Sequence, residues 1–96
     1  MDRTATAHVT TPAQARAAAR EGRRWCLRLE FYGYNPENKS GHSEKFWQLE
    51  GEGDGTVTRR WGRFGSKGQT KADGLMSALA KAAEKMAAGY RPVAGR

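Results

Sequence analysis

The most distinctive segment of this chain is Thr56-Val57-Thr58-Arg59-Arg60-Trp61-Gly62-Arg63-Phe64. It is rich in β-branched and aromatic residues and ends at a glycine-containing turn, a pattern typical of a β-strand. Side chains alternate between the two faces of a strand, so Trp61 lies on the same face as its neighbours Arg59 and Arg63. A tryptophan flanked by two cations needs an explanation.

Two interpretations of Trp61 are open at this point. In the first, its face is exposed, and the indole between two arginines forms a stacking platform for a nucleotide. In the second, Trp61 packs in the core, and strand twist or a bulge carries the arginines to solvent. Gly62 supports the first interpretation, because it leaves no side chain in the way of a closely approaching ligand.

The turn that follows the strand is strongly basic. Residues 55–72 hold five cations and no acid. Gly65-Ser66-Lys67-Gly68 has the GXXG spacing of the KH-domain loop, but that loop joins two helices, whereas this turn follows a strand. The turn predicts backbone N–H donors and one ammonium group for a phosphate.

The flanking sequence predicts an antiparallel meander closed by a helix. Residues 24–32 and 45–50 alternate as half-buried strands, and Gly51-Glu52-Gly53-Asp54-Gly55 reads as a hairpin connection to the third strand. After the basic turn, apolar residues recur at helical spacing from Leu75 to Met86, with Asp73 placed as a cap and Gly89 as the stop. We therefore expect an α+β fold, with a sheet of three to four strands and one C-terminal amphipathic helix packed across it.

The chain is long enough for one small domain, which we assign to residues 23–90. Residues 1–22 are expected to be a flexible leader. Thr11-Pro12 could begin a short basic helix there, ended by Gly22, and the leader is either an arm that orders on binding or a frayed tail. Residues 91–96 are expected to be a flexible tail.

The net charge of +7 is unevenly distributed: residues 29–54 carry −4, which leaves +11 for the rest. This asymmetry favours a polyanionic partner, although a generally basic surface would give the same composition. No run of 18 apolar residues and no secretory signal pattern occurs, so we expect a cytoplasmic protein without a membrane partner.

Catalytic and metal-binding patterns are missing from the sequence. Cys26 is the single cysteine, sits in a strand pattern and reads as a buried small hydrophobe. His8 and His42 have no thiol or carboxylate at metal-ligand spacing. We expect no enzymatic activity, no cofactor, no metal and no small-molecule substrate.

The string Arg60-Trp61-Gly62-Arg63-Phe64-Gly65, followed by Gly68-Gln69, resembles the signature of the WGR domain family, which includes a module of DNA-dependent poly(ADP-ribose) polymerases and short bacterial proteins. The resemblance extends over about residues 25–90, with a short fourth strand near residues 69–72. It implies that Trp61 stacks on a sugar at a DNA terminus and that Arg63 lies at the same surface. It also suggests Asn38 and Lys45 as groove-lining residues.

Together these observations predict a non-enzymatic module that binds duplex DNA without sequence preference, at strand ends or breaks, in a bacterial cytoplasm or nucleoid. A protein-interaction module that uses the same face, or an RNA-binding one, is the alternative. The candidate contact residues are Trp61, Gly62, Arg63, Arg59, Lys67, Gly68, Gln69, Lys45 and Asn38.

Overall fold

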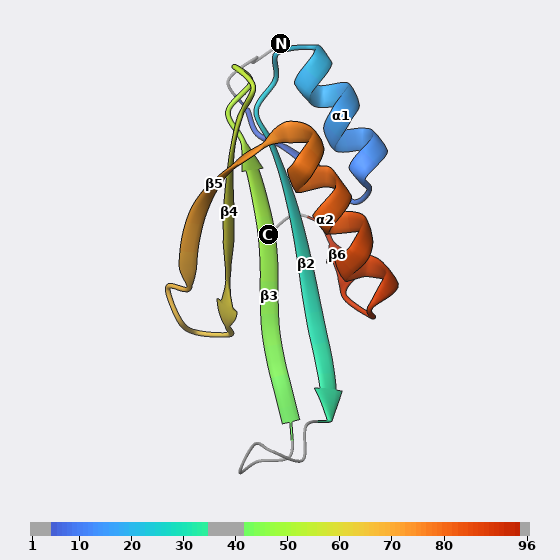
Figure 1. Cartoon of the computed structure of the whole chain (residues 1–96), viewed down its shortest axis with the longest axis vertical. Coiled ribbons are helices and arrows are strands. Elements are labelled where there is room, and N and C mark those ends of the chain that lie inside the picture. The colour runs from blue at the N-terminus through green and yellow to red at the C-terminus, as the bar shows by residue number, and fades with distance from the viewer. Residues whose placement is uncertain (1–4, 35–41, 95–96) are drawn as a thin grey trace.

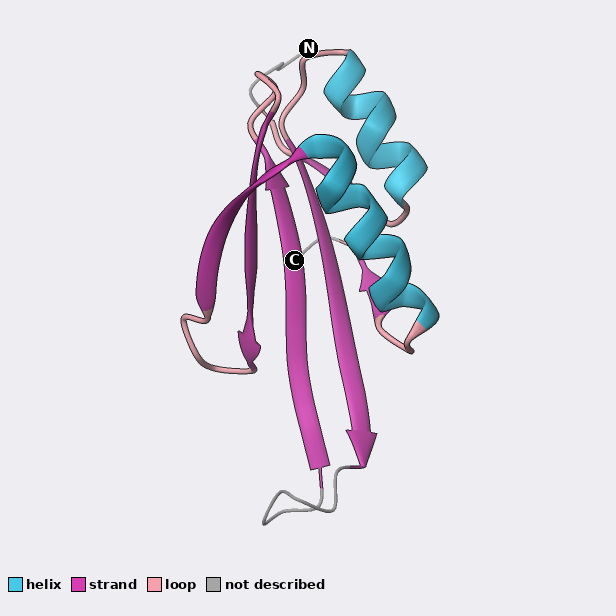
Figure 2. Ribbon diagram, in the orientation of Figure 1, coloured by secondary structure: helices cyan, strands magenta, loops and turns pink. Residues whose placement is uncertain are grey.

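The computed structural model describes residues 5–34 and 42–94, and these form a six-stranded sheet with two helices (Figures 1 and 2). In chain order the elements are β1 (Ala7–Val9), α1 (Pro12–Arg20), β2 (Trp25–Tyr34), β3 (His42–Gly51), β4 (Thr56–Arg63), β5 (Gln69–Gly74), α2 (Leu75–Ala87) and β6 (Arg91–Val93). The predicted α+β class is confirmed.

The sheet contains the predicted meander and two more strands. β2, β3, β4 and β5 are neighbours in that order, and each pair is antiparallel. The free edge of β2 takes β1 in parallel and β6 in antiparallel orientation. The expected count of three to four strands is thus too low. β1 and β6 have three residues each, too few for a period-2 pattern to reveal them.

The N-terminal residues that the structure describes include the short helix that Thr11-Pro12 predicts, and this helix is packed on the rest of the domain. Thr11 caps α1 by accepting a 3.1 Å hydrogen bond from the Gln14 N–H, and Pro12 occupies the first turn. Ala15 and Ala18 are buried in the core. Alanines can bring a helix close to a sheet without a large apolar side chain, which is why composition alone suggested a loose segment.

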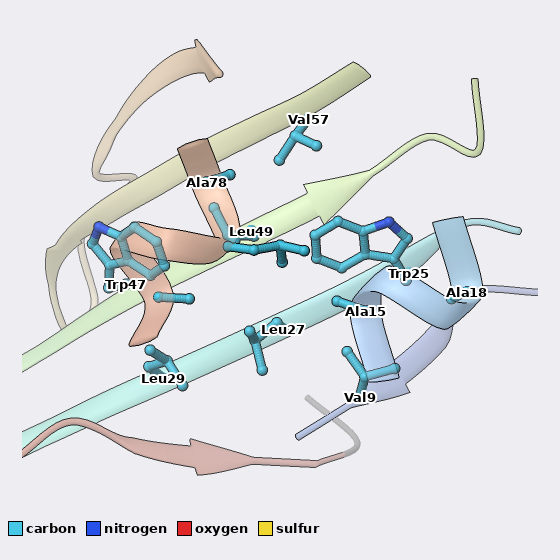
Figure 3. Close-up of a cluster of buried hydrophobic side chains, with 12 residues drawn as sticks. Val9, Ala15, Ala18, Trp25, Leu27, Leu29, Trp47, Leu49, Val57 and Ala78 are labelled. Atoms are coloured by element: carbon cyan, nitrogen blue, oxygen red, sulfur yellow. The ribbon is translucent and has the colours of Figure 1, made fainter. Parts of the chain in front are cut away.

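The core lies between the sheet and both helices (Figure 3). On this side, which we call the helical face, β2 contributes Trp25, Leu27 and Leu29, and β3 contributes Trp47 and Leu49. All five are at most 3 % exposed, so the two half-buried strands that the alternation predicts are confirmed. Figure 3 places α1 against Trp25 and α2 against Trp47, so the two helices cover successive parts of the same face.

The opposite side of the sheet, the polar face, carries a buried carboxylate. Glu30 is 1 % exposed. Its Oε2 accepts from Arg28 Nε at 2.8 Å, and its Oε1 accepts from the Tyr32 hydroxyl at 2.7 Å. The Arg28 guanidinium also lies 4.6 Å from the Phe46 ring centroid. These paired groups and an aromatic ring cover this part of the polar face, where neither of the two described helices packs.

Cys26 is buried on the polar face, as its strand pattern predicts. Burial, with a smaller contribution from the Glu50 carboxylate, raises the pKa of its thiol to about 11. The thiol is therefore protonated at neutral pH and a poor nucleophile.

Candidate nucleic-acid interface

A hollow of about 300 Å³ lies where the last turn of α2 approaches β3 and β4. The sheet supplies Lys45 and Trp61, and the end of the helix supplies Lys85 and Tyr90. Gly89, with φ of +106°, stops α2, and the Tyr90 N–H then donates to the Lys85 carbonyl at 3.1 Å. This local turn holds Tyr90 next to the sheet.

Trp61 lies on the helical face, directly opposite Trp47 of β3 and Gln69 of β5. It is partly buried and packs against the core cluster, whereas Trp47 is only 3 % exposed. The first interpretation, a strand face fully open to solvent, is therefore wrong about the face. The second interpretation, a Trp61 packed in the core, is incomplete, because Trp61 packs against the core and also lines the hollow.

The Arg59 side chain packs over Trp61 and pairs with Asp73 instead of extending into solvent. Its guanidinium carbon is 4.8 Å from the Trp61 ring centroid, and its Nε is 3.3 Å from Asp73 Oδ2. The side chains of Arg59 and Asp73 are 16 % and 7 % exposed. Lys81 approaches the same carboxylate at 3.9 Å, so Asp73 joins β4 to α2. Asp73 is not the cap of α2 that the sequence suggests, because Gly74 occupies that position.

Cations surround the hollow, and among the described residues no acid lines it. Arg63 lies directly opposite Lys45 in the β3–β4 register. The ammonium of Lys45 is 5.9 Å from the Tyr90 ring centroid, and that of Lys85 is 5.2 Å from the same ring. Three positive side chains around one aromatic-lined hollow create a site for an anion that also presents a flat apolar surface.

The glycines of the motif shape the β4–β5 turn. A Cβ on Gly62 would lie 2.8 Å from Gly68 Cα and 2.9 Å from Ser66 Oγ. Gly68 has φ of +74°, and a Cβ there would lie 2.5 Å from the Trp61 carbonyl oxygen. Gly62 therefore leaves room for the protein's own turn, rather than for a ligand as the sequence suggested.

Replacing Gly62 by alanine is expected to destabilise the domain by about 1–3 kcal/mol, because the new Cβ collides with backbone atoms of Gly68. Thermal unfolding followed by circular dichroism measures the loss, about 4–8 °C per kcal/mol for a domain of this size. Gly55→Ala is a comparison with open space around its Cβ, although its φ of +95° also carries strain. A melting temperature for Gly62→Ala equal to that of the wild type would contradict the packing argument.

The structure brings four of the predicted contact residues together in the hollow: Lys45, Trp61, Gly62 and Arg63. Gln69 is next to Trp61 in the sheet and exposed. Lys67 and Gly68 are in the turn after β4, where the Lys67 carbonyl accepts from Arg60 Nη1 at 3.2 Å. Asn38 lies outside the described residues.

Sequence reasoning missed Lys85 and Tyr90 as members of the site. The sequence marks Gly89 as the stop of the helix, but no local pattern marks Lys85 or Tyr90 as residues of the site. Their position beside Lys45 follows from how α2 crosses the sheet, which no local pattern contains.

The fold and the hollow define a small α+β domain with a basic, tryptophan-lined site at one end of its sheet. A sequence model of the WGR domain matches residues 34–95, and the chain belongs to this family, whose modules bind nucleic acids. The match begins at the last residue of β2, so β1 and α1 lie outside it. Searches of curated proteins and of solved structures found no match. Neither helix of the described residues is long and apolar enough to cross a membrane.

Proposed function

We propose that this chain is a non-enzymatic module that binds duplex DNA at strand ends, without sequence preference. The observation that carries the proposal is the hollow, where Trp61 and three cations meet and where none of the lining residues that the structure describes is an acid. Such a protein would associate with the nucleoid of a bacterial cytoplasm. It needs no cofactor and no small-molecule substrate.

Lys45, Arg63 and Lys85 are the proposed phosphate contacts. Cations that neutralise phosphates release counterions, which gives affinity that falls steeply with salt and carries no sequence information. Of the residues that line the hollow, only Lys85 belongs to a helix, so the hollow presents no helix to DNA. We therefore place no element in the major groove, and base-edge readout plays no part in the proposal.

Trp61 is the proposed reason for a preference for ends. Within a duplex the faces of interior base pairs are covered by their neighbours. An aromatic ring can therefore stack only on a terminal nucleotide, where one face is uncovered. Trp61 packs against the core and the Arg59 guanidinium lies over its ring, so the indole is held in place before binding, which reduces the entropy lost on stacking.

The direct test is a set of fluorescence anisotropy titrations at two salt concentrations. The probes are a blunt-ended duplex, a duplex closed by hairpins at both ends, single-stranded DNA and RNA. We expect the blunt duplex to bind most tightly and the affinity to fall steeply with salt. Equal binding to open and closed duplexes would remove the end preference. Tightest binding to RNA, or no binding to any probe at the lower salt concentration, would contradict the proposal.

Trp61→Ala is expected to weaken binding to the blunt duplex about 5- to 100-fold, since stacking of one ring contributes ~1–3 kcal/mol. Trp61 also contacts the core, so Trp61→Leu serves as a companion variant that keeps apolar bulk and loses the aromatic face. Both should retain the wild-type far-ultraviolet circular dichroism spectrum. Wild-type affinity in the folded Trp61→Leu variant would show that the ring does not stack.

A further inference from the structure

A second hollow, which we call the interhelical groove, lies between α1 and α2 and measures about 460 Å³. Its apolar lining includes Ala13 and Ala17 of α1, and Met76 and Leu79 of α2. Leu79 is 7 % exposed and forms the floor, while the two alanines are exposed. The groove therefore presents apolar surface to solvent.

Met76 is the most unusual side chain in the interhelical groove. It is 61 % exposed, and among the described residues only Tyr32, at 58 %, is also a large exposed hydrophobic. Tyr32 uses its hydroxyl to pair with Glu30, whereas Met76 contributes a flexible thioether to a groove wall. Methionine adapts its shape to an apolar partner, which is why it is frequent at surfaces that bind peptides.

The charges on the interhelical groove select the kind of partner. Arg16 and Arg20 lie one helical turn apart on α1, both line the groove, and no acid in the described part of the chain does. A second copy of this chain docked groove to groove would place these arginines against each other, which is unfavourable. A segment carrying carboxylates beside its apolar residues would pair with both.

The interhelical groove is separate from the hollow that contains Trp61, which we call the DNA hollow. The two sites share no lining residue, and they lie on different parts of the helices: the groove uses the first half of α2, and the hollow uses Lys85 and Tyr90 at its end. One wall of the groove, α1, also lies outside residues 34–95 that match the WGR domain. The family's nucleic-acid-binding function therefore does not account for it.

We propose that the interhelical groove binds an acidic amphipathic helix of a partner protein. The nine residues of α1 give a wall of roughly 13 Å, enough for about two and a half turns of a docked helix. Apolar side chains at i, i+3 or i+4 and i+7 of the partner would lie on Leu79 and Met76. Its carboxylates would pair with Arg16 and Arg20. The chain would thus link DNA to a second protein.

The experiment uses the full chain and a fluorescein-labelled helical peptide of about 16 residues, with Leu at i, i+3, i+4 and i+7 and Glu beside them. A matched peptide carries Lys in place of every Glu. We expect the acidic peptide to bind with a Kd of ~10–100 µM and the basic peptide at least about 10-fold more weakly. Saturating blunt duplex DNA should leave the peptide affinity unchanged.

Three variants test whether binding occurs in the interhelical groove. Arg16→Glu and Met76→Asp should each weaken the acidic peptide by about 10-fold or more, since both change exposed groove residues. Arg23→Glu makes the same charge change at an exposed residue outside the groove and should change the affinity less than about 2-fold. All three should remain folded by circular dichroism.

Several outcomes would overturn this proposal. Equal binding of the acidic and basic peptides would show that the groove does not select its partner by charge. An equal loss of peptide affinity in Arg16→Glu and Arg23→Glu would show that only the net charge of the chain matters. Wild-type peptide affinity in Met76→Asp would exclude the groove. A concentration-dependent dimer of the free chain that Met76→Asp dissociates would show that a second copy occupies it.

Discussion

Trp25→Ala is expected to leave much of the chain unfolded at 25 °C. Trp25 is 2 % exposed, and its indole packs over Gly51 on the neighbouring strand and beside Ala15 and Ala18 of α1. Truncating a buried tryptophan to alanine typically costs about 3–5 kcal/mol, because burial is lost and a cavity remains. A domain of this size has little more stability than that to lose.

Urea unfolding followed by far-ultraviolet circular dichroism measures this effect. With an m-value of ~1–3 kcal/mol/M, the midpoint should fall by roughly 2 M, or no folded baseline should remain. Trp61→Ala is the matched control, because it removes the same side chain from a partly buried position and should shift the midpoint much less. Equal shifts for the two variants would mean that Trp25 is not the main anchor of the α1 end of the core.

The central part of the fold could be predicted because its patterns are local. The alternation from Trp25 to Leu29 and the pair Trp47 and Leu49 gave the correct inward faces. The hairpin before β4 was visible from its glycines, and Gly53 and Gly55 have φ of +88° and +95°. Asp54 fixes that turn by accepting from Thr56, whose hydroxyl and N–H lower the pKa of its carboxyl.

The short helix that Thr11-Pro12 predicts is present as α1, but the two terminal strands could not be predicted, because they form by long-range pairing. β1 and β6 exist through their contact with β2, and three residues carry no recognisable period. Asp73 shows a similar limit. Its position before α2 is that of a helix cap, yet its carboxylate faces Arg59 across the sheet. A charge pair between neighbouring strands competes with local capping, and only the register reveals it.

The part of the candidate site that comes from the WGR strand could be predicted from the sequence, whereas the part that comes from the end of α2 could not. The alternation of side chains along β4 correctly placed Trp61 and Arg63 on one face of the sheet. It could not show that the helices cover most of this face, or that α2 ends near Trp61 and leaves a hollow there. The hollow exists because Gly89 stops α2 there and turns Tyr90 toward the sheet. Lys85 enters the site by the same geometry.

The variant that replaces both Lys45 and Lys85 by glutamine is expected to bind blunt duplex DNA about 60-fold more weakly at 0.1 M salt. The slope of log affinity against log salt should become shallower by about 2. Each phosphate contact contributes roughly 8-fold at this salt through counterion release. Glutamine keeps most of the aliphatic stem that packs near Tyr90 and removes the charge.

Arg16→Gln with Arg23→Gln is the charge-matched control for this double variant, because it removes two exposed cations that do not line the DNA hollow. If only the summed field of a protein of net charge +7 attracts DNA, the two double variants should lose affinity and salt slope equally. If the hollow forms the contact, only the lysine variant should lose the preference for an open end over a hairpin-closed one. The ratio of the affinities for the open and the hairpin-closed duplex, measured at constant salt, therefore distinguishes binding in the hollow from attraction to a generally basic surface. A diffuse field acts alike on both duplexes.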